Sequence, residues 1–131
     1  MAGFSDYLEG NLLDHVFSIG AGSAYAQPSL YVALSTADPG EDGTGLAEPA
    51  GNAYARVAFA DWARTANTVS NNSNVTFPEA TGNWGTITHF AVMDASTGGN
   101  VLMSSTVSPS QSVISGNTML FKTGNLTVSL D

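Results

Sequence analysis

The sequence predicts a mainly β fold, an antiparallel β-sandwich or barrel-like domain with one amphipathic helix near the N-terminus. Short runs of alternating apolar and polar residues recur along most of the 131-residue chain, and alternation with a period of two is typical of half-buried strands. Turn-forming residues, among them 14 glycines, separate these runs at short intervals, as in sandwiches and barrels. Because no linker divides the apolar segments, we expect residues 1–131 to form one domain.

The first expected element is a helix over about residues 5–19. Apolar residues recur there at spacings of three and four, as on one helical face: Phe4, Leu8, Leu12, Leu13, Val16, Phe17 and Ile19. Asp6 and Glu9 have the spacing of a capping box, and Gly20–Gly22 provides a stop. We expect the apolar face to cover the domain's own core. The alternative is that the helix inserts into a neighbouring subunit.

The remaining elements are expected to be strands. Alternation predicts them over Leu30–Ser35, Ala55–Ala60, Val75–Phe77, Ile87–Met93, Val101–Met103, Ser112–Ile114, Thr118–Lys122 and Leu126–Leu130. Pro39 and Pro78 each follow a strand and should end it, since proline donates no hydrogen bond to a ladder. The polar stretch Thr65–Asn74 shows no alternation and is expected to connect strands. We expect the C-terminal half to be a meander of sequence neighbours.

The segment Glu41–Asn52 is rich in Gly, Ala, Pro and acidic residues and has almost no large apolar residue to anchor it. We expect a long surface loop, and loops of this length in compact domains are often functional. Together with the helix and two aromatic residues it supplies the candidate assembly contacts. These are Phe4, Tyr7, Leu8, Glu41, Asp42, Glu48, Tyr54 and Trp84.

Charge and composition exclude several classes of partner. Only 11% of residues are charged and the net charge is −8, with Arg56, Arg64 and Lys122 as the cations. Three scattered cations cannot neutralise a row of phosphates, so we expect no binding to nucleic acid or to anionic membranes. Ser, Thr, Asn and Gly must cover much of the surface, and such groups are less costly to desolvate against another protein than ions.

The N-terminus lacks the cationic head of a secretory signal, and no apolar run is long enough to span a membrane. We therefore expect a protein that is made in the cytoplasm and does not enter a membrane. The chain has no cysteine, so neither a disulfide framework nor a thiolate metal site can form.

No catalytic constellation is apparent, and we expect no enzyme, cofactor or metal centre. His15 and His89 are the available histidines. Asp14 beside His15 points elsewhere around the helix axis, and His89 is flanked by Thr88 and Phe90 in a strand, so structural roles are favoured for both. Asp38, Glu41 and Asp42 offer oxygen ligands for calcium without an EF-hand spacing, which favours a solvated acidic loop.

Several segments resemble a family of small virion proteins of tailed phages, often labelled tail-fibre-like. The similar segments are Ser5–Glu9, Leu12–Val16, Tyr31–Pro39, Tyr54–Arg56, Val75–Pro78, Trp84–Phe90, Thr97–Leu102 and Leu126–Asp131. The segment Thr86–Met103 also resembles a hairpin of fibre-attachment domains. The resemblance implies a structural role in a phage particle made in the host bacterial cytoplasm, and it implies no catalytic residue.

Three hypotheses of function remain open. The first is a capsid decoration, or cement, protein that binds the major capsid protein and stabilises the shell, as a homo-oligomer for which we expect three copies. The second is a tail-associated protein at the baseplate or fibre root, bound to tail proteins. The third is a carbohydrate-binding module in which Trp62 or Trp84 stacks on a sugar.

Overall fold

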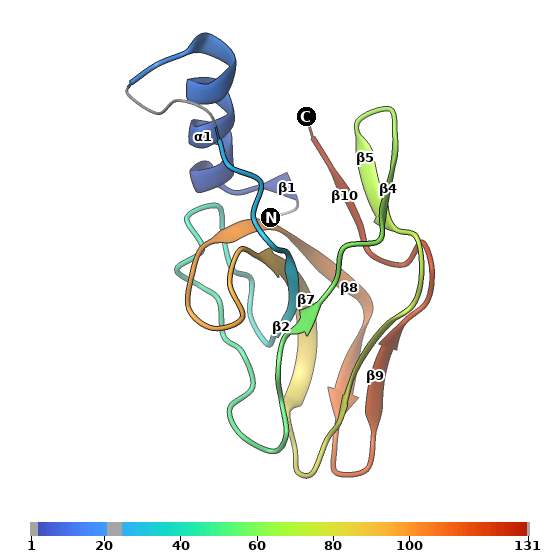
Figure 1. Cartoon of the computed structure of the whole chain (residues 1–131). Helices are drawn as coiled ribbons and strands as arrows, with labels where there is room; N and C mark the ends of the chain where they lie inside the picture. The colour runs from blue at the N-terminus through green and yellow to red at the C-terminus, as the bar shows by residue number, and fades with distance from the viewer. Residues whose placement is uncertain (1–2, 21–24, 131) are drawn as a thin grey trace.

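The computed structural model describes residues 3–20 and 25–130 and confirms the predicted fold class. One sheet has the strand order β1 (Gly3–Phe4), β8 (Val101–Val113), β7 (Gly85–Met93), β2 (Tyr31–Ser35) and β3 (Val57–Ala58). A second has the order β10 (Thr127–Ser129), β5 (Thr68–Asn71) and β4 (Trp62–Thr65), and β6 (Val75–Glu79) pairs with β9 (Thr118–Phe121). All pairings are antiparallel. The helix α1 (Asp6–Phe17) stands beyond the end of the large sheet (Figure 1).

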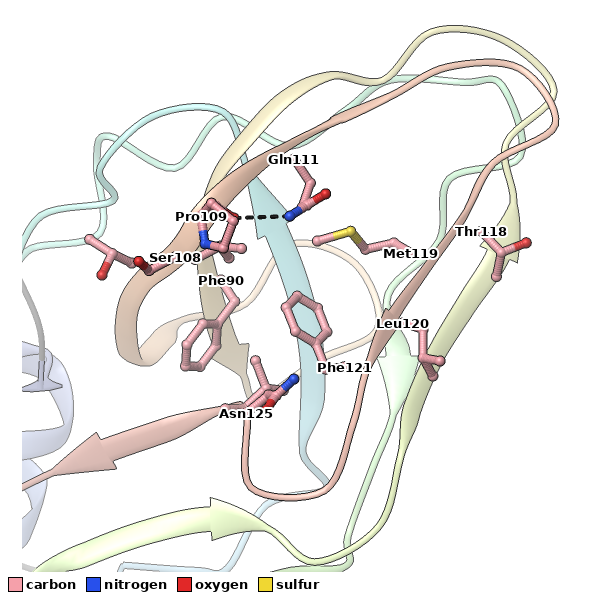
Figure 2. Close-up of a pocket in the computed structure, with 12 residues that line it drawn as sticks. Phe90, Ser108, Pro109, Gln111, Thr118, Met119, Leu120, Phe121 and Asn125 are labelled. Carbon is pink, nitrogen blue, oxygen red and sulfur yellow. Dashed lines mark hydrogen bonds between the residues drawn. The ribbon is translucent and has the colours of Figure 1, made fainter.

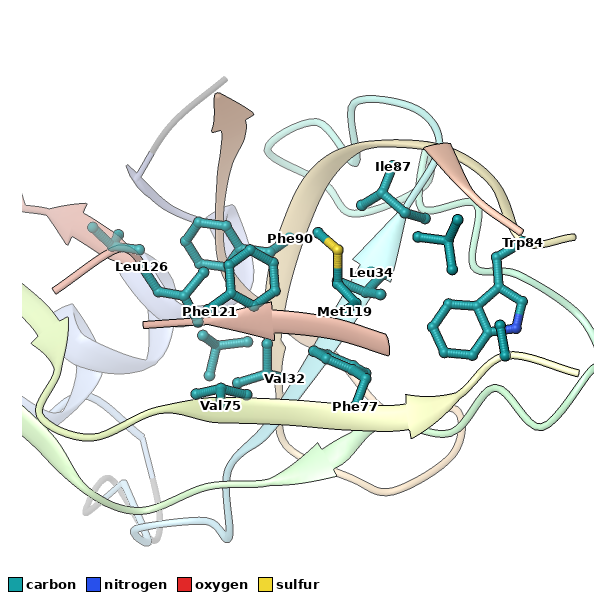
Figure 3. Packing of buried hydrophobic residues seen from close by; sticks show 14 residues of the cluster. Val32, Leu34, Val75, Phe77, Trp84, Ile87, Phe90, Met119, Phe121 and Leu126 are labelled. Carbon is teal, nitrogen blue, oxygen red and sulfur yellow. The ribbon is translucent and has the colours of Figure 1, made fainter. Parts of the chain in front are cut away.

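The main core lies between the five-stranded sheet and strands β6, β9 and β10 (Figure 3). Strand β2 shows why alternation predicted it: Val32 and Leu34 are fully buried in this core, and Ala33 points to the opposite face. Across the core, the ring of Phe77 on β6 packs edge-on against Phe121 on β9, with centroids 6.1 Å apart. Aromatic and β-branched side chains therefore tie the two layers together.

The second face of the large sheet is covered by the segment that we expected to be an unanchored surface loop. Residues 41–52 are irregular, as predicted. However, Leu46 packs against a small buried cluster that includes Ala33, Met93 and Val101. The Ser35 hydroxyl accepts a hydrogen bond from the Ala47 N–H at 3.0 Å. The expectation that nothing anchors this segment is wrong, because one leucine and backbone hydrogen bonds hold it to the sheet.

Strand β8 is one 13-residue strand where the sequence predicted two short ones at Val101–Met103 and Ser112–Ile114. Its middle is rich in Ser and Thr and contains Pro109, so it lacks the apolar alternation that marks a strand. It pairs with β7 along most of its length, with a register shift near His89. The pairing with β7 stops at Thr106 and resumes at Gln111, so the two predicted pieces are joined into one strand through an irregular segment that contains Pro109.

The polar stretch Thr65–Asn74 contains a hairpin, which the sequence analysis missed. Strands β4 and β5 meet at the two-residue turn Ala66–Asn67, where Ala66 has a φ of 52°. Hairpin turns that need positive φ are usually signalled by Asn-Gly or Asp-Gly, and this one is not. The prediction that Pro78 ends its strand is also wrong, since β6 continues to Glu79 after a register shift.

The predicted meander is correct for β7 and β8 alone. Strand β9 pairs with β6, and β10 pairs with β5, so the C-terminal strands return to the middle of the chain. Asn71 supports this return from a buried position. Its side-chain amide donates to the carbonyls of Ser73 and Lys122, both at 2.9 Å, and its Oδ1 accepts from the Leu126 N–H at 2.9 Å.

Candidate functional site

The helix α1 carries the two most exposed large apolar side chains of the described residues, Phe17 at 68% and Val16 at 62%. Leu13, also on the helix, is 56% exposed. At about 100° per residue, the nine positions from Leu8 to Phe17 amount to about two and a half turns, so these two side chains lie on opposite faces. Leu13, Val16 and Phe17 form one apolar surface, called here the outer helix face.

The inner side of the helix is fixed to the sheet. Ser5 is the N-cap, and its side-chain oxygen accepts from the Leu8 N–H at 3.3 Å and donates to the carbonyl of Val101. The Ser5 N–H donates to the Leu102 carbonyl at 2.8 Å, and the Asp6 N–H to Glu41 at 2.9 Å. Capping therefore comes from Ser5 and not from the predicted Asp6–Glu9 box.

The prediction that α1 covers the domain's own core is wrong. Within the helix, which is described in full, Leu8 is the one buried residue. The apolar residues that we assigned to one face span too wide an arc to be buried together, and most of them face away from the sheet. The helix ends at Ser18, which has a φ of 54°. Ala21 and Gly22 of the predicted stop lie outside the described residues.

A shallow pocket lies between the start of α1, the 41–48 segment and the turn that joins β7 to β8. Its lining includes Tyr7, Asp42 and Glu48, so the structure brings three of the predicted contact residues together. Tyr7 is 42% exposed and Asp42 is exposed. Hydrogen bonds from the N–H and the hydroxyl of Thr44 lower the pKa of the Asp42 carboxyl.

Glu48 and Arg56, which line this pocket, form a linked cluster with Tyr54. Burial would raise the pKa of the Glu48 carboxyl, but hydrogen bonds from Arg56 and Tyr54 outweigh it, so the pKa lies below its ordinary value. Arg56 binds Glu48 through two nitrogens, at 2.9 and 2.7 Å, and also donates to the carbonyls of Ala95 and Gly98. The sequence analysis did not identify this role of Arg56. The cluster fastens the 41–56 segment to the β7–β8 turn.

Two other predicted contact residues face the core. Trp84 is 4% exposed, and its indole N–H donates to the Asn52 carbonyl at 2.9 Å. Its ring meets Tyr54 edge-on at 5.3 Å, and the Tyr54 hydroxyl donates to Glu48 and accepts from the Leu34 N–H. Trp84 therefore offers no free ring face on which a sugar could stack.

The remaining predicted contacts lie around the attachment of the helix. Phe4 is half-buried on β1 and packs against the main core, whereas Glu41 is exposed and its carbonyl receives the Asp6 N–H. The assignment of the eight candidates as assembly contacts stays a prediction.

An apolar groove opens between the segment before β2, the end of β3 and the β4–β5 hairpin. Its volume is about 660 Å³. The large side chains in it are half-buried: Leu30, Tyr31, Phe59, Trp62, Val69 and Met103. The rings of Phe59 and Trp62 meet edge-on at 5.1 Å, and the Trp62 indole N–H donates to the Phe59 carbonyl at 3.2 Å, which fixes this wall.

A third hollow separates β8 from β9 (Figure 2). Ser108, Pro109 and Gln111 lie on its β8 side, and Met119 and Phe121 lie on its β9 side. Its lining residues, all within the described ranges, include no titratable side chain. This hollow therefore offers packing volume and backbone edges but no acid–base chemistry.

Both histidines take part in local contacts within the described residues. Among residues 3–20 and 25–130, no group of three or more His, Asp or Glu side chains is placed to hold a metal ion. His15 accepts a hydrogen bond from the Tyr25 N–H through Nδ1 at 3.1 Å. His89 bonds to Thr88 through Nδ1, and its Nε2 lies 4.0 Å from an Asp38 oxygen. In the same ranges, no helix has the length and apolar character to cross a membrane.

Comparison with known proteins adds one finding. The sequence model of a family described as "Podophage GP4 fiber I protein gp80" matches residues 3–129, which is nearly the whole chain. The search of curated proteins gave no match.

Proposed function

The chain belongs to the family of the podophage GP4 fiber I protein gp80, and from this premise we propose that it is a non-enzymatic structural component of a podophage tail, situated at a fibre or its root. The family supports a virion protein that associates with other phage structural proteins. In this proposal the tail-associated hypothesis takes precedence over capsid decoration, because the family description names a fibre.

The observation that carries the proposal is the outer helix face. Monomeric soluble proteins seldom expose neighbouring large apolar side chains without a partner for them. Leu13, Val16 and Phe17 are each more than half exposed, on a helix whose first turn Ser5 and Leu8 attach to the sheet. An apolar helix face that the chain's own core does not use is suited to dock against another virion subunit.

The free energy gained by burying the outer helix face is too small to hold two subunits together without further contacts. Full burial of one such side chain contributes about 1.5–3 kcal/mol, so the exposed parts of three contribute roughly 3–5 kcal/mol on docking. Association costs an estimated 4–15 kcal/mol of lost freedom, or about as much as this gain or more. The outer helix face alone cannot hold a complex, and repeated copies or a second surface must add avidity.

Location and copy number on purified particles test the proposal. We expect gold-labelled antibody against the chain to mark tails and quantitative mass spectrometry to find a few to a few dozen copies per particle. Label spread over the shell, with hundreds of copies, would contradict it.

The composition favours a second candidate function, capsid decoration. With 11% charged residues and a surface of hydroxyls and amides, the protein is suited to broad contact with the major capsid protein. Within residues 3–20 and 25–130, the strands form a compact sandwich and no extended shaft (Figure 1). In this case purified protein should bind expanded capsids and raise their disruption temperature, and saturating binding without that rise would exclude a cementing role.

A further inference from the structure

We propose that the outer helix face of one copy docks into the apolar groove of a second copy of this chain. The inference rests on the assembly role proposed for the helix and names its partner. The two surfaces match in chemistry, since both are apolar. One is the exposed helix surface of Leu13, Val16 and Phe17, and the other is a hollow of about 660 Å³ with Phe59 and Trp62 in its wall.

The groove is already formed in the single chain. The edge-on contact of Phe59 and Trp62 and the hydrogen bond between them fix one wall. Val69 of β5 and Met103 of β8 are half-buried lining residues. A docked helix would remove these surfaces from water without first ordering a loop, so little of the binding free energy is lost to reorganisation.

The charges beside the two surfaces favour a helix from a second copy as the occupant of the groove. Two acidic helix residues, Glu9 and Asp14, flank the outer helix face and are exposed. Arg64 lies two residues after Trp62 on β4 and directly opposite Val69 in the β4–β5 register, so its side chain leaves the same face of the hairpin as these lining residues. Arg64 is exposed and donates to the Ala66 carbonyl. In a chain of net charge −8, a cation at the groove rim is suited to an acidic helix.

A second copy must provide the helix. In its own chain α1 is held at the β8 end of the molecule by the hydrogen bonds of Ser5 and Asp6, and its outer face is exposed to solvent. Figure 1 shows the helix apart from the β4–β5 hairpin. Each copy thus offers one outer helix face and one groove, and a head-to-tail contact of this kind closes into a ring when its rotation allows. In the trimer expected from the sequence, each outer helix face would lie in the apolar groove of the next copy, and no groove would be left empty.

Cysteine cross-linking tests the contact directly, because the chain has no native cysteine. Two full-length populations with different tags carry Gly10→Cys and Ala60→Cys, respectively. Gly10 is exposed, has open space around it and lies seven positions before Phe17, on the same side of the helix, and Ala60 is an exposed groove residue. We expect a disulfide between the two tagged chains on mild oxidation. Ser115→Cys, in the exposed turn between β8 and β9, is the matched control and should not cross-link to Gly10→Cys.

A charge exchange provides an independent readout. We expect Arg64→Glu to weaken self-association roughly 2- to 5-fold in sedimentation experiments, and Asp14→Lys in the same chain to restore it. Lys122→Glu makes the same change in net charge away from the groove and should leave self-association unaltered.

Each alternative outcome overturns the inference. Disulfides between Gly10→Cys chains, with none to Ala60→Cys, would mean that helices pack on helices. A monomer at all concentrations with no cross-link would mean that another virion protein binds the helix. Neither result affects the proposed tail position, which the labelling of particles tests separately.

Discussion

Replacing Phe17 with serine should separate assembly from folding. The ring is 68% exposed and lies on the outer helix face, opposite the buried Leu8. Because the ring fills no space in the core, we expect the free energy of unfolding to change by no more than about 0.5 kcal/mol. Burying the exposed two thirds of the ring in a partner contributes about 1–2 kcal/mol, so self-association should weaken about 5- to 30-fold.

Phe77→Ala is the matched control in the core. Phe77 is 2% exposed and packs against Phe121 and Tyr54, so its truncation should cost about 3–5 kcal/mol of unfolding free energy. Urea denaturation measures stability for both variants, and sedimentation velocity over a range of concentrations measures association. The reasoning is refuted if Phe17→Ser loses more than about 2 kcal/mol of stability, or if it associates as tightly as the unaltered chain.

Three further predictions concern the buried polar groups. Arg56→Met leaves the Glu48 carboxylate without its bidentate partner, and we expect a loss of about 2–3 kcal/mol in urea denaturation, less than for a fully buried pair because Glu48 is 22% exposed. Since the pKa of Glu48 is lowered in the folded state, its contribution is complete above the unfolded-state pKa and is lost as the pH falls through the folded-state value. Glu48→Gln should therefore flatten the decline in stability between about pH 5 and pH 3, and an unchanged pH profile would contradict the lowered pKa. Asn71→Ala leaves a buried Leu126 N–H without its acceptor and should cost about 2–4 kcal/mol, whereas Asn72→Ala at the exposed neighbouring position should change thermal stability little.

The strands that were predicted well are those whose side chains alternate between core and surface. Val32 and Leu34 enter the main core while Ala33 faces the other side, which is the pattern that a period of two encodes. The middle of β8 and the β4–β5 hairpin carry no such pattern. Backbone pairing to β7 on both sides of a register shift joins the pieces of β8, and the hairpin turns at Ala66 with a positive φ, where the sequence has none of the usual signals.

The candidate site was predictable in part. Sequence spacing identified the helix and the 41–52 segment, and the structure brings Tyr7, Asp42 and Glu48 to one pocket. Counting apolar residues at spacings of three and four did not show that Leu8 and Phe17 lie on opposite faces, although their separation of nine positions indicates it. The apolar groove joins residues distant in sequence, such as Trp62 and Met103, and local patterns do not reveal long-range contacts of this kind.

The most direct test of the tail-associated role is the position and number of copies of this chain in purified particles. The account predicts gold label confined to the tail and a few to a few dozen copies per particle by quantitative mass spectrometry. Hundreds of copies distributed over the shell would contradict it and would favour the capsid decoration hypothesis.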